Sequence, residues 1–209
     1  MWFIIILQMI QNKVSILRVT PTLLVAIASI LAGCTSNKTV DSSIVPDSVY
    51  IQTGNHLVAL TFDTLRNSLL KAIGDQGLDG AISFCNERAY PLTHIYTDSA
   101  SIRRTSIKFR NPDNQPDSLE LRMLISMEQK QVLNGQPAAV IVRDDKRELV
   151  HFFKPIIVQP MCLNCHGKSD RFIQQPTLQR INQLYPDDLA IDYEEGDFRG
   201  LWHITFNSQ

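Results

Sequence analysis

The fold class is decided by residues 138–157, which read AAVIVRDDKRELVHFFKPII. Two apolar runs, at 138–142 and 148–157, flank a charged turn at 144–146, and this arrangement is typical of a β-hairpin. A further run at 198–206 predicts a closing strand. The apolar side chains expected on one face of that strand are Phe198, Trp202, Ile204 and Phe206.

Two helices are predicted ahead of this sheet. The first should end at Gly74 and Gly77, because glycine favours helix ends. The second carries Cys85 on its apolar face, and Pro91 marks its expected end. The stripe that defines the first helix has apolar residues three or four positions apart, at Val58, Phe62, Leu65, Leu69 and Ile73.

Between these helices and the hairpin, residues 102–110 alternate as a strand would. A polar loop then leads to a third helix, which Asp117 should cap with Glu120 as its capping-box partner. A short helix is expected at 177–185 after the hairpin. Helices followed by an antiparallel sheet with helical insertions define an α+β fold.

Composition limits the function classes. The chain has 209 residues, 44% of them hydrophobic, and a net charge of −1. This length suits one domain with its own core, expected over residues 47–209. Because no basic excess is available to neutralise phosphates, we expect no nucleic-acid partner.

The N-terminus has the pattern of an export signal. Residues 1–33 contain no Asp or Glu, and a short apolar stretch closes on Leu31-Ala32-Gly33-Cys34. That tetrapeptide resembles the lipobox of bacterial lipoproteins, in which Cys34 would be acylated and become the mature N-terminus. An uncleaved membrane anchor is the alternative, and translation could begin at Met9 instead of Met1.

Residues 34–46 then read as a polar tether. The folded part is therefore expected on the periplasmic side of a bacterial membrane, lipid-anchored at Cys34. The sequence leaves open whether this is the inner or the outer membrane.

The strongest chemical motif is Cys162-Leu163-Asn164-Cys165-His166. Two thiols separated by two residues can form thioethers to one haem, and the following histidine is then held as the proximal iron ligand. A disulfide between Cys162 and Cys165 and a zinc site are the alternatives. The zinc site lacks a recognisable fourth ligand in the sequence. We therefore expect one covalently attached haem c.

The second axial ligand has several candidates. Cys85 is the thiol left over when Cys34 is acylated and the two motif cysteines are bonded to haem, although a free cysteine is usually a small buried hydrophobe. The other sulfur and nitrogen candidates are Met123, Met127, Met161, His56, His94, His151 and His203.

Several stretches together resemble the c-type haem domain family with a PAS-like fold, long catalogued as a domain of unknown function. The matching stretches occur in family order at 81–89, 102–112, 154–156, 162–167, 185–188 and 196–200. The resemblance implies a PAS-like antiparallel sheet. It also implies axial ligation by His166 and an upstream cysteine, which is Cys85 here.

One face of the predicted strand at 102–110 carries Arg104, Lys108 and Arg110. These side chains are expected to pair with the haem propionates, and an ordinary solvated face is the alternative.

A six-coordinate iron favours an electron-transfer or redox-responsive protein. The alternative is a haem-based gas or redox sensor that signals through a partner protein, because the chain carries no output segment of its own. No nucleophile-base pair or phosphate loop occurs, so we expect no enzyme activity; peroxidase-like catalysis would need a displaceable ligand. A cytochrome c-prime bundle is the alternative fold, but the β-like runs disfavour it.

Overall fold

The computed structural model describes residues 45–135 and 138–207. The expected signal at 1–33, Cys34 and nearly all of the tether lie outside the described residues. The helices in chain order are α2 (Asp47–Phe84), the π-helix η1 (Cys85–Ala89), α3 (Tyr90–Thr93), the 3-10 helix η2 (Pro112–Asn114), α4 (Ser118–Asn134), the 3-10 helix η3 (Pro160–Cys162), α5 (Leu163–His166) and α6 (Gln175–Leu184). None of the helices in these ranges is long and apolar enough to cross a membrane.

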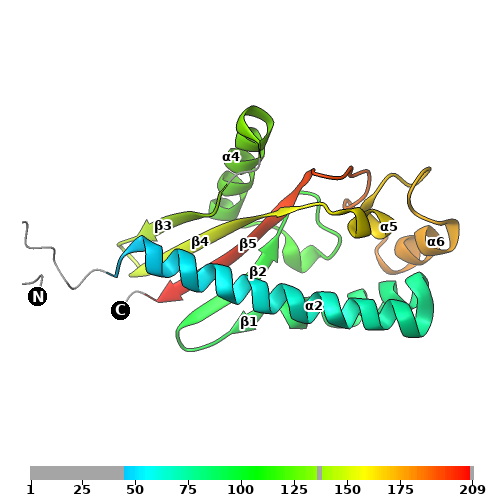
Figure 1. The fold of residues 1–209 in the computed structure, drawn as a ribbon, viewed down its shortest axis with the longest axis horizontal. Helices are drawn as coiled ribbons and strands as arrows, with labels where there is room; N and C mark the ends of the chain where they lie inside the picture. Colours follow the sequence, from blue (N-terminus) through cyan, green and yellow to red (C-terminus); the bar gives the residue numbers. More distant parts are fainter. Residues whose placement is uncertain (1–44, 136–137, 208–209) are drawn as a thin grey trace, which may run out of the picture. The chain divides into compact units, whose positions relative to one another are not determined.

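Five strands form one sheet in the order β1-β2-β5-β4-β3, and all neighbouring pairs are antiparallel (Figure 1). The strands are β1 (Ile95–Tyr96), β2 (Ala100–Thr105), β3 (Val140–Asp144), β4 (Leu149–Ile157) and β5 (Phe198–Asn207). The expected hairpin at 138–157 and the closing strand are confirmed as β3–β4 and β5. The α+β class is confirmed as well.

The two faces of the sheet are covered by different helices. Strand residues alternate between faces, so neighbours Phe152 and Phe153 of β4 enter separate core clusters, and both are fully buried. Phe152 packs in the cluster that contains Tyr50 and Val58 of α2. Phe153 packs with residues of α4, whose first turn has the predicted capping box between Asp117 and Glu120.

The approach of α2 to the sheet depends on Gly54. A Cβ atom at this position would lie 2.7 Å from the ring of Phe152, closer than real Cβ contacts. The absent side chain therefore lets the helix backbone rest directly on the aromatic ring. This contact places the far end of α2 beyond the sheet, beside α6 (Figure 1).

The helix ends differ from those expected. Gly74 does not end the first helix; α2 runs on to Phe84, and its only break is at Gly77, where φ is +71°. Residues other than glycine rarely adopt a positive φ, so Gly77 marks the break between two helical segments. Pro91 does not stop the second segment, because it lies in the first turn of α3, where proline is tolerated.

Two strand expectations were wrong in part. β2 ends at Thr105 and not at residue 110, because the hydroxyl of Ser106 donates to the carbonyl of Arg199 at 2.7 Å and the chain leaves the sheet. Phe198 does not share a face with Trp202, since it packs in the cluster of Leu201. The pairing of β4 and β5 shifts between Ile156 and Ile157, and this irregularity changes the face.

Candidate haem site

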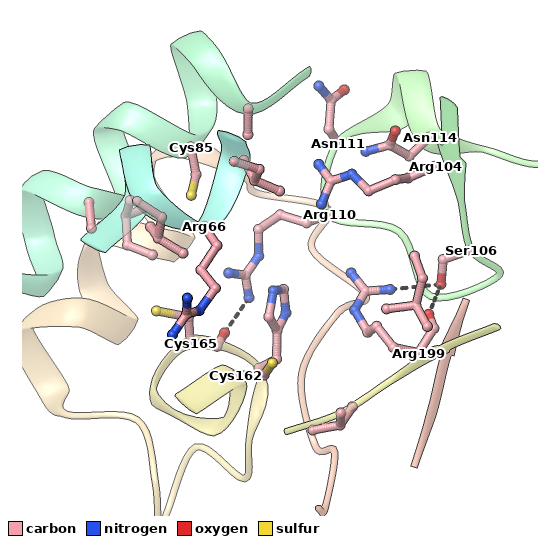
Figure 2. Close-up of a pocket in the computed structure, with 18 of the residues that line it drawn as sticks. Arg66, Cys85, Arg104, Ser106, Arg110, Asn111, Asn114, Cys162, Cys165 and Arg199 are labelled. Atoms are coloured by element: carbon pink, nitrogen blue, oxygen red, sulfur yellow. Dashed lines mark hydrogen bonds between the residues drawn. The ribbon is translucent and has the colours of Figure 1, made fainter. Parts of the chain in front are cut away.

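A cavity lies where the end of α2, the ends of β2 and β4 and the Cys-rich segment meet. All the predicted haem-binding residues line it except Lys108 (Figure 2). The residues of the wall that carry sulfur, imidazole or guanidinium groups are Arg66, Cys85, Arg104, Arg110, Met161, Cys162, Cys165, His166 and Arg199.

The Cys-rich segment forms a short helical turn, and apolar contacts on its inner side hold it against the rest of the protein. Leu163 is buried with Val158 and Tyr193, which anchors the turn to the protein. Gly167 ends it, and a Cβ atom there would lie 2.7 Å from the carbonyl oxygen of Leu163. With its apolar residue turned inward, the turn leaves Cys162 and Cys165 partly accessible at the cavity wall.

The His166 ring is held in place by a backbone carbonyl. Its Nδ1 lies 2.7 Å from the carbonyl oxygen of Ala190. Burial lowers the pKa of His166 well below its usual value, and the positive charges of Arg110 and Arg199 lower it further. The ring is therefore neutral, with Nδ1 as the donor, and Nε2 keeps its lone pair. His166 is half-buried and lines the cavity wall.

Cys85 is the first residue of the π-helix η1. Short π-helical turns are rare and occur often at functional sites. Burial raises the pKa of the Cys85 thiol, while the charges of Arg104 and Arg110 oppose the increase. Without a metal this thiol is protonated at neutral pH, and iron binding would displace its proton.

The thiol of Cys165 has a similar environment. Burial raises its pKa to about 11, and negative charge on Cys85 and Cys162 would raise it further. The opposing influence is Arg110. The three cysteines are thus close enough to influence one another, and the tertiary structure brings Cys85 to the attachment motif.

Arg110 is fixed to the Cys-rich segment. One of its terminal nitrogens, Nη2, donates to the carbonyl oxygen of Cys165 at 2.7 Å and to the carboxylate of Asp188 at 2.8 Å. Asp188 also accepts a hydrogen bond from the backbone of Ala190 at 2.9 Å. Arg110 and Asp188 therefore support both the attachment turn and the carbonyl that orients His166.

Arg104 and Lys108 are not equivalent. Arg104 lines the cavity, and burial together with Arg199 lowers its pKa to about 10. Lys108 is absent from the wall: its ammonium donates to the carbonyl of Ile191 and lies 4.4 Å from the ring centre of Tyr193. The early end of β2 removes the shared face on which both residues were expected. A propionate contact from Lys108 is not supported.

The competing axial candidates lie elsewhere, with one exception. Met127 is buried in the cluster under α4, and Met123 packs against it. His56 is exposed, and His94 lies against Tyr90 and Tyr96. His151 and His203 are joined to each other at 3.0 Å. Met161 alone of these candidates reaches the cavity wall within the described ranges.

Sequence reasoning missed two residues of the site. Arg199 comes from β5 and Tyr185 from the end of α6, and both line the cavity. Both positions lie in stretches that resemble the haem domain family, Arg199 in 196–200 and Tyr185 in 185–188. This resemblance was the signal that could have identified them. No spacing rule could link them to Cys85, since they are distant in the chain.

The residues present fit a covalently held haem. The donor set combines three half-buried thiols and a neutral imidazole oriented by a backbone carbonyl. Guanidinium groups in the same wall suit carboxylate groups. A zinc site is less suitable: no group of three or more His, Cys, Asp or Glu side chains in the described ranges is arranged to hold a metal ion by itself.

These features define a class of α+β protein with a CxxCH turn beyond the end of an interior strand of an antiparallel sheet. The chain belongs to the Tll0287-like family, whose model matches residues 36–207. This confirms the resemblance seen in the sequence. A crystal structure of the cyanobacterial heme-protein Tll0287 is similar at 23% identity with a TM-score of 0.49, over 75% of this chain and 96% of that chain. No curated protein matches the chain.

Proposed function

We propose that this protein binds one haem c through thioethers from Cys162 and Cys165, with His166 and Cys85 as axial ligands. The observation that carries the proposal is the hydrogen bond from His166 Nδ1 to the Ala190 carbonyl, which frees Nε2 for iron. The family similarity to a heme-protein adds support. When bound, haem iron supplies one-electron exchange between its ferric and ferrous states.

Electron transfer or redox response suits this ligand set best. If the chain itself supplies both axial ligands, no iron position is open to a substrate. A thiolate ligand stabilises the ferric state, so the reduction potential should be low compared with that of a His/Met cytochrome. The protein would then exchange electrons with a separate redox partner, and we propose no enzyme activity for it.

A haem-based gas or redox sensor is the second candidate. The observation that favours it is the π-helix that begins at Cys85, because π-helical turns are rare and occur frequently at functional sites. Release of Cys85 from iron would then move the end of α2, and a partner protein would read the change.

The first experiment asks whether haem c is bound and by which ligands. Purified protein should give a pyridine haemochrome spectrum of haem c and a mass increase that survives denaturation. Cys162→Ser and Cys165→Ser should each remove one thioether. Cys85→Ser should convert the low-spin ferric EPR spectrum to a different one, while Met161→Leu, the matched control, should leave it unchanged. An unchanged spectrum in Cys85→Ser would contradict the cysteine ligand.

A redox titration with carbon monoxide then separates the two functions. A carrier should show reversible electron exchange without gas binding. A sensor should bind the gas and lose the spectral signature of the Cys85 ligand.

We also propose that the chain is exported and lipid-anchored at Cys34 on the periplasmic side of a bacterial membrane. The lipobox-like tetrapeptide that ends at Cys34 supports this location. Labelling with a fatty acid should mark the wild-type protein and not Cys34→Ser. Equal labelling of both chains would contradict the anchor.

A further inference from the structure

Of the four arginines in the cavity wall, Arg104 and Arg199 are half-buried and form no ion pair in the described part of the chain, while Arg66 is exposed. Arg104 donates through Nε to the hydroxyl of Thr93 at 3.2 Å. Arg199 donates through Nη1 to Ser106 Oγ at 2.8 Å and to the carbonyl of Lys108 at 2.9 Å. These partners are neutral. A half-buried cation without a counter-charge is poorly solvated, so both positions are suited to an anion that the wall does not supply.

Arg110 is different, although it faces the same cavity. Its charge is neutralised by Asp188, and both side chains are nearly inaccessible, at 9% and 5% exposure. Its remaining bonds go to backbone carbonyls of the site. Arg110 therefore holds the Cys-rich segment through Nη2, while its buried Nε has no hydrogen-bond partner in the described part of the chain.

Arg104 and Arg199 come from neighbouring strands. β2 and β5 are paired, and Arg104 of β2 lies opposite Trp202 of β5. Arg199 lies near the start of β5, immediately before Gly200. Both side chains point into the cavity (Figure 2). They are close enough for the charge of Arg199 to lower the pKa of Arg104. The two positive charges repel each other, and a ligand that carries two negative groups would offset this repulsion.

The charge of a thiolate-ligated haem matches this pair. A ferric porphyrin with one thiolate ligand is neutral at its centre, so its two propionates leave the group a dianion. Guanidinium groups bind carboxylates with paired, charge-assisted hydrogen bonds.

We propose that Arg104 and Arg199 form a carboxylate-binding pair that holds the two propionates of the haem. This rests on the haem-binding function proposed above. The sequence predicted that Arg104, Lys108 and Arg110, on one face of a single strand, would bind the propionates. The pair proposed here comes from two strands instead. Arg110 becomes a positioning residue for the attachment turn.

The test uses the haem-loaded full-length protein and single Arg104→Gln and Arg199→Gln variants. Loss of a positive charge near the iron makes reduction less favourable, so each variant should have a lower reduction potential, and the double variant the lowest. The propionates should also become reactive toward a water-soluble carbodiimide with glycinamide, measured by the mass of the haem peptide. Arg104→Lys and Arg199→Lys should restore most of the potential.

Arg122→Gln and Arg147→Gln are the matched controls, because each removes a positive charge from an exposed arginine outside the cavity wall. They should leave the potential near that of the wild-type protein. Unchanged potential, or equal propionate reactivity in wild-type and Gln variants, would overturn the assignment. If the wild-type protein carries no haem, the proposed function itself fails, which is a separate and visible result.

Discussion

His166 and Ala190 are joined by a hydrogen bond of 2.7 Å between Nδ1 of the imidazole and the backbone carbonyl oxygen. The carbonyl is held in turn, because Asp188 accepts from the Ala190 amide and pairs with Arg110. The orientation of the expected iron ligand therefore depends on a buried ion pair that belongs to neither the cysteine motif nor its flanking residues.

Removal of Asp188 should be strongly destabilising. Asp188→Ala leaves the guanidinium of Arg110 buried without a counter-charge, which should lower the free energy of unfolding by about 3 kcal/mol. Urea denaturation of the haem-loaded protein measures the change. Asp47→Ala is the control: its partner Arg143 pairs with it at the surface, so the loss should stay under about 1 kcal/mol. Equal effects would contradict the structural importance of the buried pair.

Gly54→Ala tests the contact between α2 and the sheet. The new methyl group would overlap the ring of Phe152, so we expect a loss of about 2 kcal/mol in the free energy of unfolding. Gly74→Ala is the matched change on the same helix, where a Cβ atom meets nothing within 4 Å. It should be stabilising by up to about 1 kcal/mol, because alanine favours helix more than glycine. Destabilisation of similar size in both variants would be inconsistent with this contact.

Glu120→Gln tests the buried polar group beneath α4. The Glu120 carboxylate is fully buried and bonds Arg103 at 3.2 Å and His203 at 2.7 Å. Loss of its charge should lower the free energy of unfolding by about 3 kcal/mol, since His203 stays buried and Arg103 half-buried beside it. Glu128→Gln, an exposed change on the same helix, should have almost no effect in the same thermal or urea measurement.

Stability should fall on acidification. Burial lowers the pKa of His151, and the neighbouring His203 lowers it further; burial also lowers the pKa of His94. Both side chains bind a proton more readily when unfolded, so their contribution is complete above the unfolded pKa of about 6.5 and is lost as pH falls below it. Urea midpoints at pH 7.5, 6.5 and 5.5 measure the trend.

His151→Gln should make that dependence shallower, because it removes one of the histidines whose pKa is lowered in the folded protein. His56→Gln is the control, as His56 is an exposed residue of α2. A dependence that is unchanged in His151→Gln would show that other groups control acid stability.

Local patterns predicted those elements that depend on neighbouring residues. The β3–β4 hairpin follows from two apolar runs around a charged turn, and the capping box of Asp117 and Glu120 follows from their spacing. The end of β2 did not follow, because it depends on a bond from Ser106 to Arg199, residues far apart in sequence. The face of Phe198 was missed for a similar reason, since it depends on the pairing irregularity with β4.

For the site, the order of residues along the chain was sufficient to identify the CxxCH motif and to predict its cofactor, because the spacing of two thiols and an imidazole is a local property. The residues that surround the motif were decided by the tertiary structure. It brought Cys85 to that motif, paired Arg110 with Asp188, turned Lys108 away and placed Arg199 in the wall. These arrangements depend on burial and on charges contributed by distant segments, which act only once the chain has brought them within a few ångströms of one another.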